Sequence, residues 1–145
     1  MSKRKKRGGL AAAVRTVARL RSPKGCPWDR RQTHRSLIPY LREESRELAE
    51  ALKTGAPHEI EDELGDVLFQ VLLHARIAEE AGLFDIDDVA ASLSLKLRRR
   101  HPHVFSGGPK FKTAGEVLRR WDAVKSRERL LRRRDAARRG LLRKA

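Results

Sequence analysis

Carboxylate side chains gather in two short stretches of a chain that is otherwise strongly basic. The 145 residues carry a formal net charge of +15, yet residues 40–50, "YLREESRELAE", and residues 61–66, "EDELGD", are acidic. Residues three or four apart lie on the same face of a helix. Each stretch, read as a helix, therefore presents carboxylates to one side, an arrangement suited to holding a cation.

The first stretch places an acid where a leucine is expected. Its apolar residues form one helical stripe, the face that normally turns inward: Leu37, Leu41, Leu48 and Leu52. Glu44 falls inside that stripe, and Glu47 lies at its edge, next to Glu44. Because an unpaired buried carboxylate is costly and tends to take up a proton, the sequence predicts a positive partner beside Glu44.

The second stretch repeats this arrangement. Its predicted inward stripe consists of five apolar residues: Ile60, Leu64, Val67, Val71 and Ala75. Glu63 lies on the border of the stripe, and Asp66 follows one turn later on the same side. Two helices thus offer acid pairs of equal spacing to a common interior. Acids on glutamate-rich helices are usually solvated, which suffices to explain four others nearby: Glu59, Glu61, Glu79 and Glu80.

The expected partner is either a basic side chain or a metal ion. The nearby basic residues, chiefly Arg42, Arg46 and Lys53, are too few to neutralise four or five acids on that face. Carboxylates without a histidine three residues later favour Mg²⁺ or Mn²⁺ over zinc or a di-iron centre. Because Mg²⁺ in proteins is commonly completed by substrate phosphates, the expected ligand is a polyphosphate.

The acidic motif stands among other distinctive segments. "CPWDRRQTHRSLIPYL" precedes it, and "LFQVLLHARIAEEAGLFD" and "RRHPHVF" follow it. Together, over roughly residues 9–128, these segments resemble the MazG-type nucleoside triphosphate pyrophosphohydrolases, in a single-domain form. The resemblance implies an all-α bundle, a homodimer, and Mg²⁺-dependent hydrolysis of NTP or dNTP to the nucleoside monophosphate and pyrophosphate.

The resemblance also implies roles for particular residues. The metal ligands would be the acids singled out above: Glu44, Glu47, Glu63 and Asp66. Glu43 matches the first acid of the motif and joins these four as a catalytic residue, with a supporting role in orienting the attacking water. The implied substrate-binding residues are Lys96, Arg100, Trp121 and Lys125.

These basic and aromatic residues also have roles suggested by their spacing. Lys96 and Arg100 lie one helical turn apart, so they either face the same interior as the acids or extend along the surface at a helix end. Trp121 has helical spacing to Val117, so it serves either the core or the nucleotide. Lys125, one turn after Trp121, is expected to reach a phosphate.

Histidines are expected to have structural roles. His101 and His103 flank a proline in a predicted loop, whose shape they would fix. His34 and His74 stand singly on predicted helices, where structural hydrogen bonding is the usual role.

The elements that must carry all these residues are helical. Glycine, proline and capping residues divide the chain into about five helices, and no stretch alternates long enough for a confident strand. The predicted helices cover residues 9–21, the region from an Asp29–Gln32 capping box to Lys53, Pro57 to Gly82, Asp85 to the "HPHVF" segment, and a helix opened by a Thr113–Glu116 capping box. The predicted fold is an all-α helical bundle, which the resemblance implies is completed by dimerisation.

Charge is unevenly distributed along the chain. Residues 1–35 carry a net charge of +11, residues 36–100 carry −6, and residues 101–145 carry +10. An acidic middle between basic ends is unlike a plain nucleic-acid binder and suits a site for cations surrounded by an anionic ligand. The predicted organisation is a disordered basic tail (1–8), a catalytic domain (9–130) and a basic C-terminal extension (131–145), which either continues the last helix or frays.

A second hypothesis concerns the basic tails. It describes a non-catalytic nucleic-acid or ribosome-associated protein, whose binding would weaken steeply with salt and would survive loss of the acids. Weak nucleic-acid contact through the tails is also compatible with catalysis.

Two features bear on location. Cys26 is the only cysteine, so no disulfide framework is expected, which fits a reducing cytoplasm. The basic N-terminus is followed by an apolar run that arginines interrupt, so we expect neither a secretory signal nor a membrane span. The sequence therefore predicts a cytoplasmic protein without a membrane partner.

Overall fold

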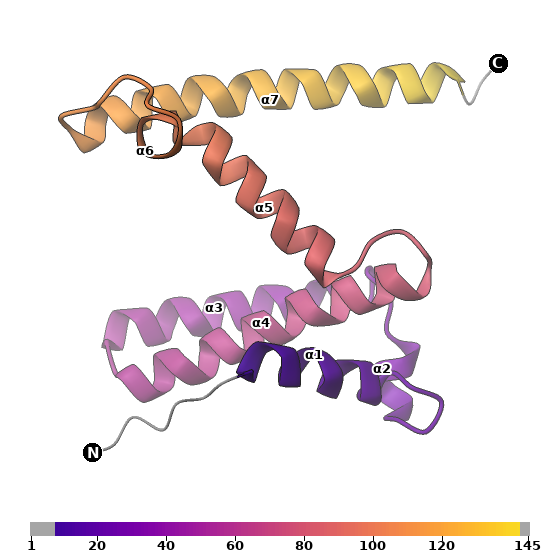
Figure 1. Cartoon of the computed structure of the whole chain (residues 1–145). Coiled ribbons are helices and arrows are strands. Elements are labelled where there is room, and N and C mark those ends of the chain that lie inside the picture. The colour runs from indigo at the N-terminus through magenta and orange to yellow at the C-terminus, as the bar shows by residue number, and fades with distance from the viewer. Residues whose placement is uncertain (1–7, 143–145) are drawn as a thin grey trace. The chain divides into compact units, whose positions relative to one another are not determined.

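The computed structural model describes residues 8–142, and side chains as far as residue 134. All regular secondary structure in this part of the chain is helical, which confirms the predicted all-α class (Figure 1). The helices are, in chain order, α1 (Gly9–Leu20), α2 (Pro27–Arg31), α3 (Ile38–Thr54), α4 (Pro57–Glu80), α5 (Ile86–Arg100), α6 (Pro102–Phe105) and α7 (Ala114–Leu142). Apart from Gly8, the predicted disordered tail lies outside the described residues.

Two short helices were not predicted separately, and one predicted cap is wrong. Asp29 does not open a helix: it lies inside α2 and is buried, while Gln32 ends that helix in an extended conformation. Proline is pre-organised for the first turn of a helix, so Pro27 starts α2 two residues earlier than expected. The other short helix, α6, contains His103 and follows His101 directly, where a loop was predicted.

Other helix boundaries follow from local hydrogen bonds. The Asp85 and Asp88 side chains each accept a hydrogen bond from the other residue's backbone N–H, at 2.9 and 3.1 Å, which caps α5. Thr113 Oγ1 accepts the Glu116 N–H at 3.3 Å, so the predicted cap of α7 is confirmed on its threonine side. The C-terminal extension continues α7 as far as Leu142.

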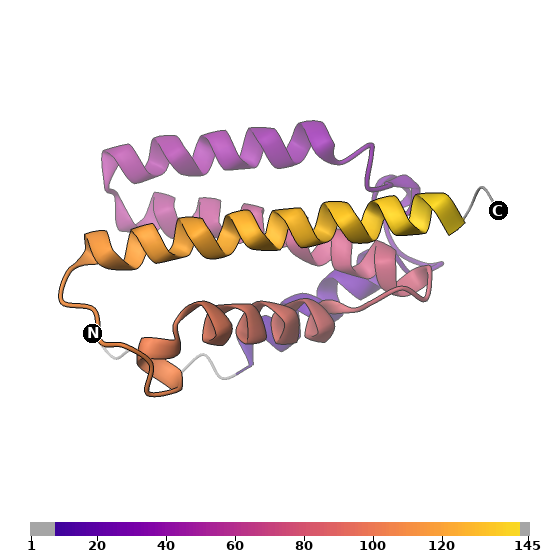
Figure 2. The same ribbon diagram turned by 90° about the horizontal axis from the view of Figure 1, so that it is seen from above.

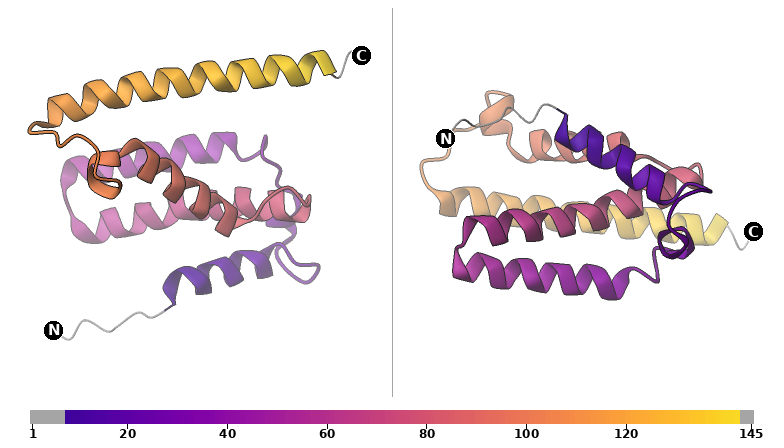
Figure 3. Two further views of the ribbon diagram at one scale, coloured as in Figure 1. Left: turned by 45° about the horizontal axis from the view of Figure 1, so that its top comes forward. Right: turned by 90° about the horizontal axis from the view of Figure 1, so that it is seen from below.

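The chain forms two compact units, residues 1–90 and residues 91–145. In the first unit α3 and α4 run side by side, joined by a tight turn (Figure 2). Gly55 permits this turn because it ends α3 with a φ of 74°, which side chains other than glycine rarely adopt. Figure 3 shows α4 between α3 and α1.

The core of the first unit lies where these three helices meet. Its buried apolar residues are Val17 from α1, Leu37 from just before α3, and Leu72 and Leu73 from α4. Leu37 and Leu73 are wholly buried, at 0% exposure. Burying a leucine side chain contributes about 2 kcal/mol, so these contacts fix the relative positions of α3 and α4.

The predicted inward stripes are only partly correct. Leu37 and Ala75 are buried, but several other stripe residues are exposed: Leu41, Leu52, Leu64 and Val71. Within this unit α3 and α4 pack on each other and α4 packs on α1, so part of each apolar stripe finds no helix of the unit to cover it. This exposed surface, extended by Leu68, is called the open apolar face below.

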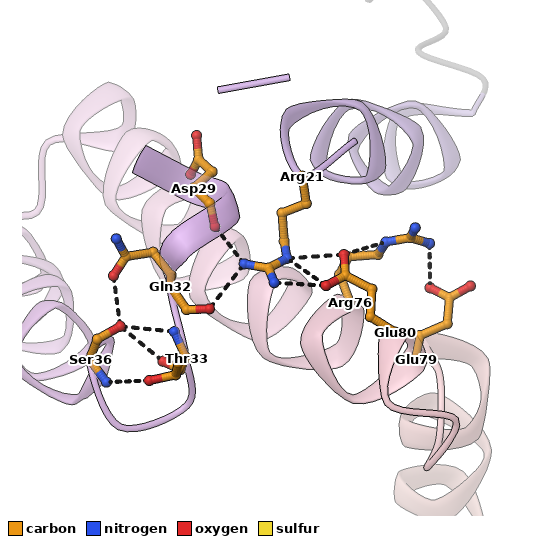
Figure 4. Close-up of polar contacts among 8 residues, drawn as sticks. All are labelled: Arg21, Asp29, Gln32, Thr33, Ser36, Arg76, Glu79 and Glu80. Carbon is orange, nitrogen blue, oxygen red and sulfur yellow. Dashed lines mark hydrogen bonds and ion pairs between the residues drawn. The ribbon is translucent and has the colours of Figure 1, made fainter. Parts of the chain in front are cut away.

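A buried arginine fastens α1 to α2 and α4. The Arg21 side chain, 6% exposed, lies in an ion pair with Glu80 at 2.7 Å. Its guanidinium also donates to the backbone carbonyls of Asp29, at 2.5 Å, and Gln32, at 3.2 Å (Figure 4). The hydrogen bonds that Glu80 itself accepts, from Arg21 first and also from Arg76, hold the pKa of the Glu80 carboxyl below its ordinary value. Arg21 therefore anchors the segment that leads into α3.

The close approach of this segment also requires a glycine. A Cβ atom on Gly25 would lie 2.0 Å from the Leu20 carbonyl oxygen, a clash that the backbone could not relieve. That carbonyl accepts the Cys26 N–H at 2.8 Å. Any side chain at Gly25 would push α2 away from the end of α1.

The second unit contains most of α5, the short α6 and the long α7. Arg99 and Arg100, at the end of α5, both bind Glu128 of α7. Aromatic rings fill the region around α6. The His101 ring packs edge-on against Trp121, with ring centres 4.7 Å apart, and the His103 ring packs against Phe111, with ring centres 4.9 Å apart.

Of the helices in the described part of the chain, none is long and apolar enough to cross a membrane.

Candidate active site

Three carboxylates converge between α3 and α4. Glu44 comes from α3, and Glu63 and Asp66 come from α4. One carboxylate oxygen of each lies within 4.8 Å of the others. Glu63 and Asp66 share a face of α4 because they are three residues apart, and the packing of α3 on α4 brings Glu44 opposite them. Glu44 and Glu63 are half-buried, whereas Asp66 is exposed and opens the cluster to solvent.

The electrostatics of this cluster are unfavourable while it lacks a counter-charge. Burial raises the pKa of the Glu44 carboxyl above its ordinary value, and the negative charges of Asp66 and Glu47 raise it further. The pKa of Glu63 is raised in the same way, first by burial and then by Glu47 and Asp66. Both shifts record the cost of burying a carboxylate and, after that, of gathering like charges in one place.

The donor set fits a hard divalent cation. No lysine or arginine in the described part of the chain forms an ion pair with any of the three carboxylates. In addition, Glu63 Oε2 is buried without a hydrogen-bond partner, although buried polar atoms are normally paired. All the donors are carboxylate oxygens, the ligand type that Mg²⁺, Mn²⁺ and Ca²⁺ prefer.

Two other acids predicted to belong to the site lie at its edge. Glu47 is not among the converging ligands, and its Oε1 accepts a hydrogen bond from Arg46 at 3.3 Å. Its charge nevertheless raises the pKa of both Glu44 and Glu63. Glu43 is exposed, and its charge contributes to the raised pKa of Glu44. The structure thus joins three of the four predicted metal ligands, and Glu47 as a ligand stays a prediction.

The predicted substrate-binding residues all belong to the second unit. Arg100 Nη2 lies 2.5 Å from Glu128 Oε2, so this guanidinium already has an anionic partner. The Lys125 ammonium lies 5.4 Å from the centre of the Trp121 ring, a cation–π contact. Lys96 is half-buried, one turn before Arg100 on α5.

Comparison with known proteins supports a specific family. The sequence model of the MazG nucleotide pyrophosphohydrolase domain matches residues 32–105, just over half of the chain. The matched segment contains the three converging carboxylates. The chain belongs to this family. The resemblance seen in the sequence is therefore confirmed.

Individual relatives agree with this assignment. This MazG domain is 49% identical over 116 residues to a nucleoside triphosphate pyrophosphohydrolase/pyrophosphatase MazG of Thermotoga maritima, covering 80% of this chain and 44% of that protein. It is 45% identical over 114 residues to a nucleoside triphosphate pyrophosphohydrolase of Escherichia coli, covering 78% and 43%. The chain thus spans less than half the length of these curated relatives.

A solved structure supports the fold. The crystal structure of a mazG-related protein from Thermotoga maritima superimposes on this MazG domain with a TM-score of 0.63 at 27% identity. The superposition covers 80% of this chain and 98% of that one.

Some contacts of the MazG domain were missed from its sequence. His34 and His74, predicted to stand singly, are stacked with their Nδ1 atoms 2.8 Å apart, and burial lowers the pKa of His74. Glu128 was not singled out at all, although it binds two arginines. In the sequence Glu128 follows Lys125 by three residues in an arginine-rich helix, and nothing in that spacing indicates partners almost thirty residues earlier.

Proposed function

We propose that this MazG domain hydrolyses nucleoside triphosphates, NTP or dNTP, to the nucleoside monophosphate and pyrophosphate with the help of a divalent metal ion. The observation that supports it best is the convergence of Glu44, Glu63 and Asp66 within 4.8 Å, with no ion-pair partner among the lysines and arginines that the structure describes. The names of the relatives, nucleoside triphosphate pyrophosphohydrolases, support the choice of substrate.

The acids of α3 and α4 would hold the metal and position water. Glu44, Glu63 and Asp66 would be its ligands, with Glu47 as a fourth. When bound, Mg²⁺ or Mn²⁺ would supply the Lewis acidity that activates water and offsets phosphate charge. Glu43 is expected to orient the attacking water toward the α-phosphorus. None of these acids needs to act as a nucleophile, because phosphoryl transfer depends mainly on positioning and electrostatics.

The basic residues of the second unit would bind the substrate. Lys96, Arg100 and Lys125 are the cations expected to neutralise charge on the departing pyrophosphate. Trp121 is expected to contact the nucleotide, and its indole Nε1 is buried without a hydrogen-bond partner in the described structure. An unpaired buried donor is costly, so a ligand acceptor there would be stabilising.

The test is an assay of each ribo- and deoxynucleoside triphosphate with Mg²⁺, and with Mn²⁺ in parallel. Monophosphate and pyrophosphate are quantified separately from diphosphate and phosphate. We expect monophosphate and pyrophosphate in equal amounts, and none after EDTA. Diphosphate and phosphate as products, or activity that persists in EDTA, would contradict the proposal.

We also propose that the protein is a cytoplasmic homodimer. The open apolar face supports dimerisation, since Leu52 and Leu64 are 58% and 52% exposed and would be covered by a second copy. Light scattering coupled to size-exclusion chromatography should give twice the mass of 16.5 kDa. Leu52→Glu with Leu64→Glu should lower that mass to one chain.

A second candidate function rests on α7. Arg132, Arg133 and Arg134 are exposed along this helix, which suits the phosphate backbone of a nucleic acid. Affinity for RNA or DNA should then fall steeply with salt and disappear when the basic tails, residues 1–8 and 132–145, are removed. Unchanged triphosphate turnover in the same truncated protein would show that such binding is separate from catalysis.

A further inference from the structure

One carboxylate of the second unit holds two neighbouring arginines together. Glu128 Oε1 lies 2.5 Å from Arg99 Nη2, and Glu128 Oε2 lies 2.5 Å from Arg100 Nη2. The Glu128 and Arg100 side chains are only 14% and 15% exposed, whereas Arg99 is exposed. Each oxygen of Glu128 thus serves one guanidinium, and the Arg100 pair is shielded from water.

Two consecutive residues of a helix seldom bind the same side chain. Consecutive helical residues point about 100° apart, so the two guanidinium groups would ordinarily diverge. Glu128 draws them to one point on α7, where two positive charges face one negative charge. The cluster therefore keeps an excess positive charge, next to the Lys125 and Trp121 pair one turn or two earlier on α7.

The Arg100 guanidinium keeps unused donors. A guanidinium has five N–H groups in a fixed fork, and Glu128 takes one from Nη2 of Arg100. The Nε atom of Arg100 is buried and has no partner in the described structure. Such a donor is costly to leave unpaired, so this edge of the guanidinium suits an additional acceptor, for example a phosphate oxygen.

We propose that Glu128 is a positioning residue, which holds the Arg100 guanidinium, with Arg99 beside it, in the orientation that binds the phosphate groups of the nucleotide. This inference rests on the proposed function, because it assigns Arg100 to the substrate. Glu128 itself does not touch the substrate and acts through Arg100.

The charge state of Glu128 suits this role. Hydrogen bonds from Arg100 and Arg99 lower the pKa of the Glu128 carboxyl to about 2. Glu128 therefore stays ionised, and stays paired with Arg99 and Arg100, at the near-neutral pH at which the assays are done.

A purely electrostatic role of Glu128 and a positioning role predict different effects of Glu128→Gln on the kinetics. Removing a negative charge near the arginines would, by itself, strengthen binding of a polyphosphate and lower KM. Loss of positioning should instead lower kcat, by about 10–100-fold, the range found when the hydrogen-bond partner of a metal ligand is removed. The matched control is Asp122→Asn, which makes the same charge change at an exposed position of α7.

The experiment measures kcat and KM of both variants with Mg²⁺ and the triphosphate that the wild-type protein cleaves best. We expect a fall in kcat for Glu128→Gln and wild-type values within about twofold for Asp122→Asn. Equal kinetics in the two variants would overturn the inference while leaving the proposed function intact. Absence of cleavage by the wild-type protein would overturn both.

A double-mutant cycle tests whether Glu128 acts through Arg100. If Glu128 acts through Arg100, then Glu128→Gln should cost nothing further in an Arg100→Ala background. Additive losses in the two variants would contradict positioning. Glu128→Asp, which keeps the charge on a shorter side chain, should restore part of kcat, and circular dichroism should show the helical content of the wild type in every variant.

Discussion

Glutamates of the two units meet opposite electrostatic surroundings. Glu44 and Glu63, between α3 and α4, are half-buried beside other carboxylates, and their pKa values are raised. Glu128, in the second unit, lies between two arginines, and its pKa falls to about 2. In one case the fold brings like charges together, and in the other it provides the counter-charge itself.

The presence or absence of an arginine partner separates carboxylates that stabilise the protein from carboxylates that need a bound cation to offset their charge. A carboxylate with its own arginine gains from ionisation, as Glu80 does with Arg21. A cluster without such a partner costs stability, so it persists in a protein for another reason, such as binding a cation. Changing each kind of carboxylate in turn tests this difference.

The largest expected effect comes from Glu63→Gln in the unpaired cluster. Loss of one ligand should lower turnover by about 10²–10³-fold, the range for removing one preorganised electrostatic group. Stability should not fall, since like-charge repulsion is relieved. Turnover and thermal melting of the purified variant check both. The control is Glu50→Gln, an exposed glutamate of α3 that pairs with Lys53, and it should keep full turnover. Wild-type activity in Glu63→Gln would end the metal-site assignment.

The second-largest expected effect is the stabilisation of the folded protein by Mg²⁺, which should depend on the unpaired carboxylates and not on Glu128. Mg²⁺ at 100 times its dissociation constant should stabilise the wild-type protein by about 2.7 kcal/mol, because only the folded state gathers the ligands. The melting temperature with and without Mg²⁺, at matched ionic strength, measures this gain. It should vanish in a Glu44→Gln, Glu63→Gln double variant and persist in Glu128→Gln. An equal gain in all three proteins would point to nonspecific ion effects.

Breaking a paired carboxylate should have a smaller effect, on stability alone. Arg21→Met removes the guanidinium that binds Glu80 and two backbone carbonyls, so the free energy of unfolding should fall by about 2 kcal/mol. Urea denaturation at neutral pH measures it. Arg19→Met is the matched control, because Arg19 is exposed at the end of the same helix and should change stability by less than about 0.5 kcal/mol. Equal losses in the two variants would show that Arg21 is not an anchor.

Local spacing in the sequence was enough to predict the acids of the site and two helix caps. The acids of α3 and α4 were found because Glu44 interrupts a leucine stripe and Glu63 and Asp66 are one turn apart. Three of these acids do converge. Helix caps at Asp85 and Thr113 were also predicted, since a cap depends only on residues three positions apart.

Contacts between distant segments were not predictable in the same way. Arg21 and Glu80 are 59 residues apart, and Arg100 and Glu128 are 28 apart, so no helical period links them. Arg21 looks like an ordinary surface cation in the sequence, and Arg100 was singled out for the substrate and not for a carboxylate partner. The apolar stripes failed for a related reason: the spacing identifies an apolar face, as at Leu64, but not whether a helix of the same unit covers it.

The smallest expected effect, a shift in pH dependence, tests the comparison most directly. The pKa of Glu128 is about 2 in the folded protein and 4.5 ordinarily, so its stabilising contribution is complete above pH 4.5 and is lost as pH falls toward 2. Glu44 and Glu63 have raised folded pKa values, so their ionisation lowers stability as pH rises above 4.5.

Two variants should therefore deviate from the wild type in opposite directions. In EDTA above pH 4.5, Glu128→Gln should melt below the wild type, and the two curves should converge as pH approaches 2. The Glu44→Gln, Glu63→Gln variant should melt above the wild type at neutral pH and lose that advantage as the pH falls through the raised pKa values toward 4.5. Calorimetric melting across this pH range measures both gaps. Deviations of the same sign would show that the two groups of glutamates do not differ in the way their neighbours indicate.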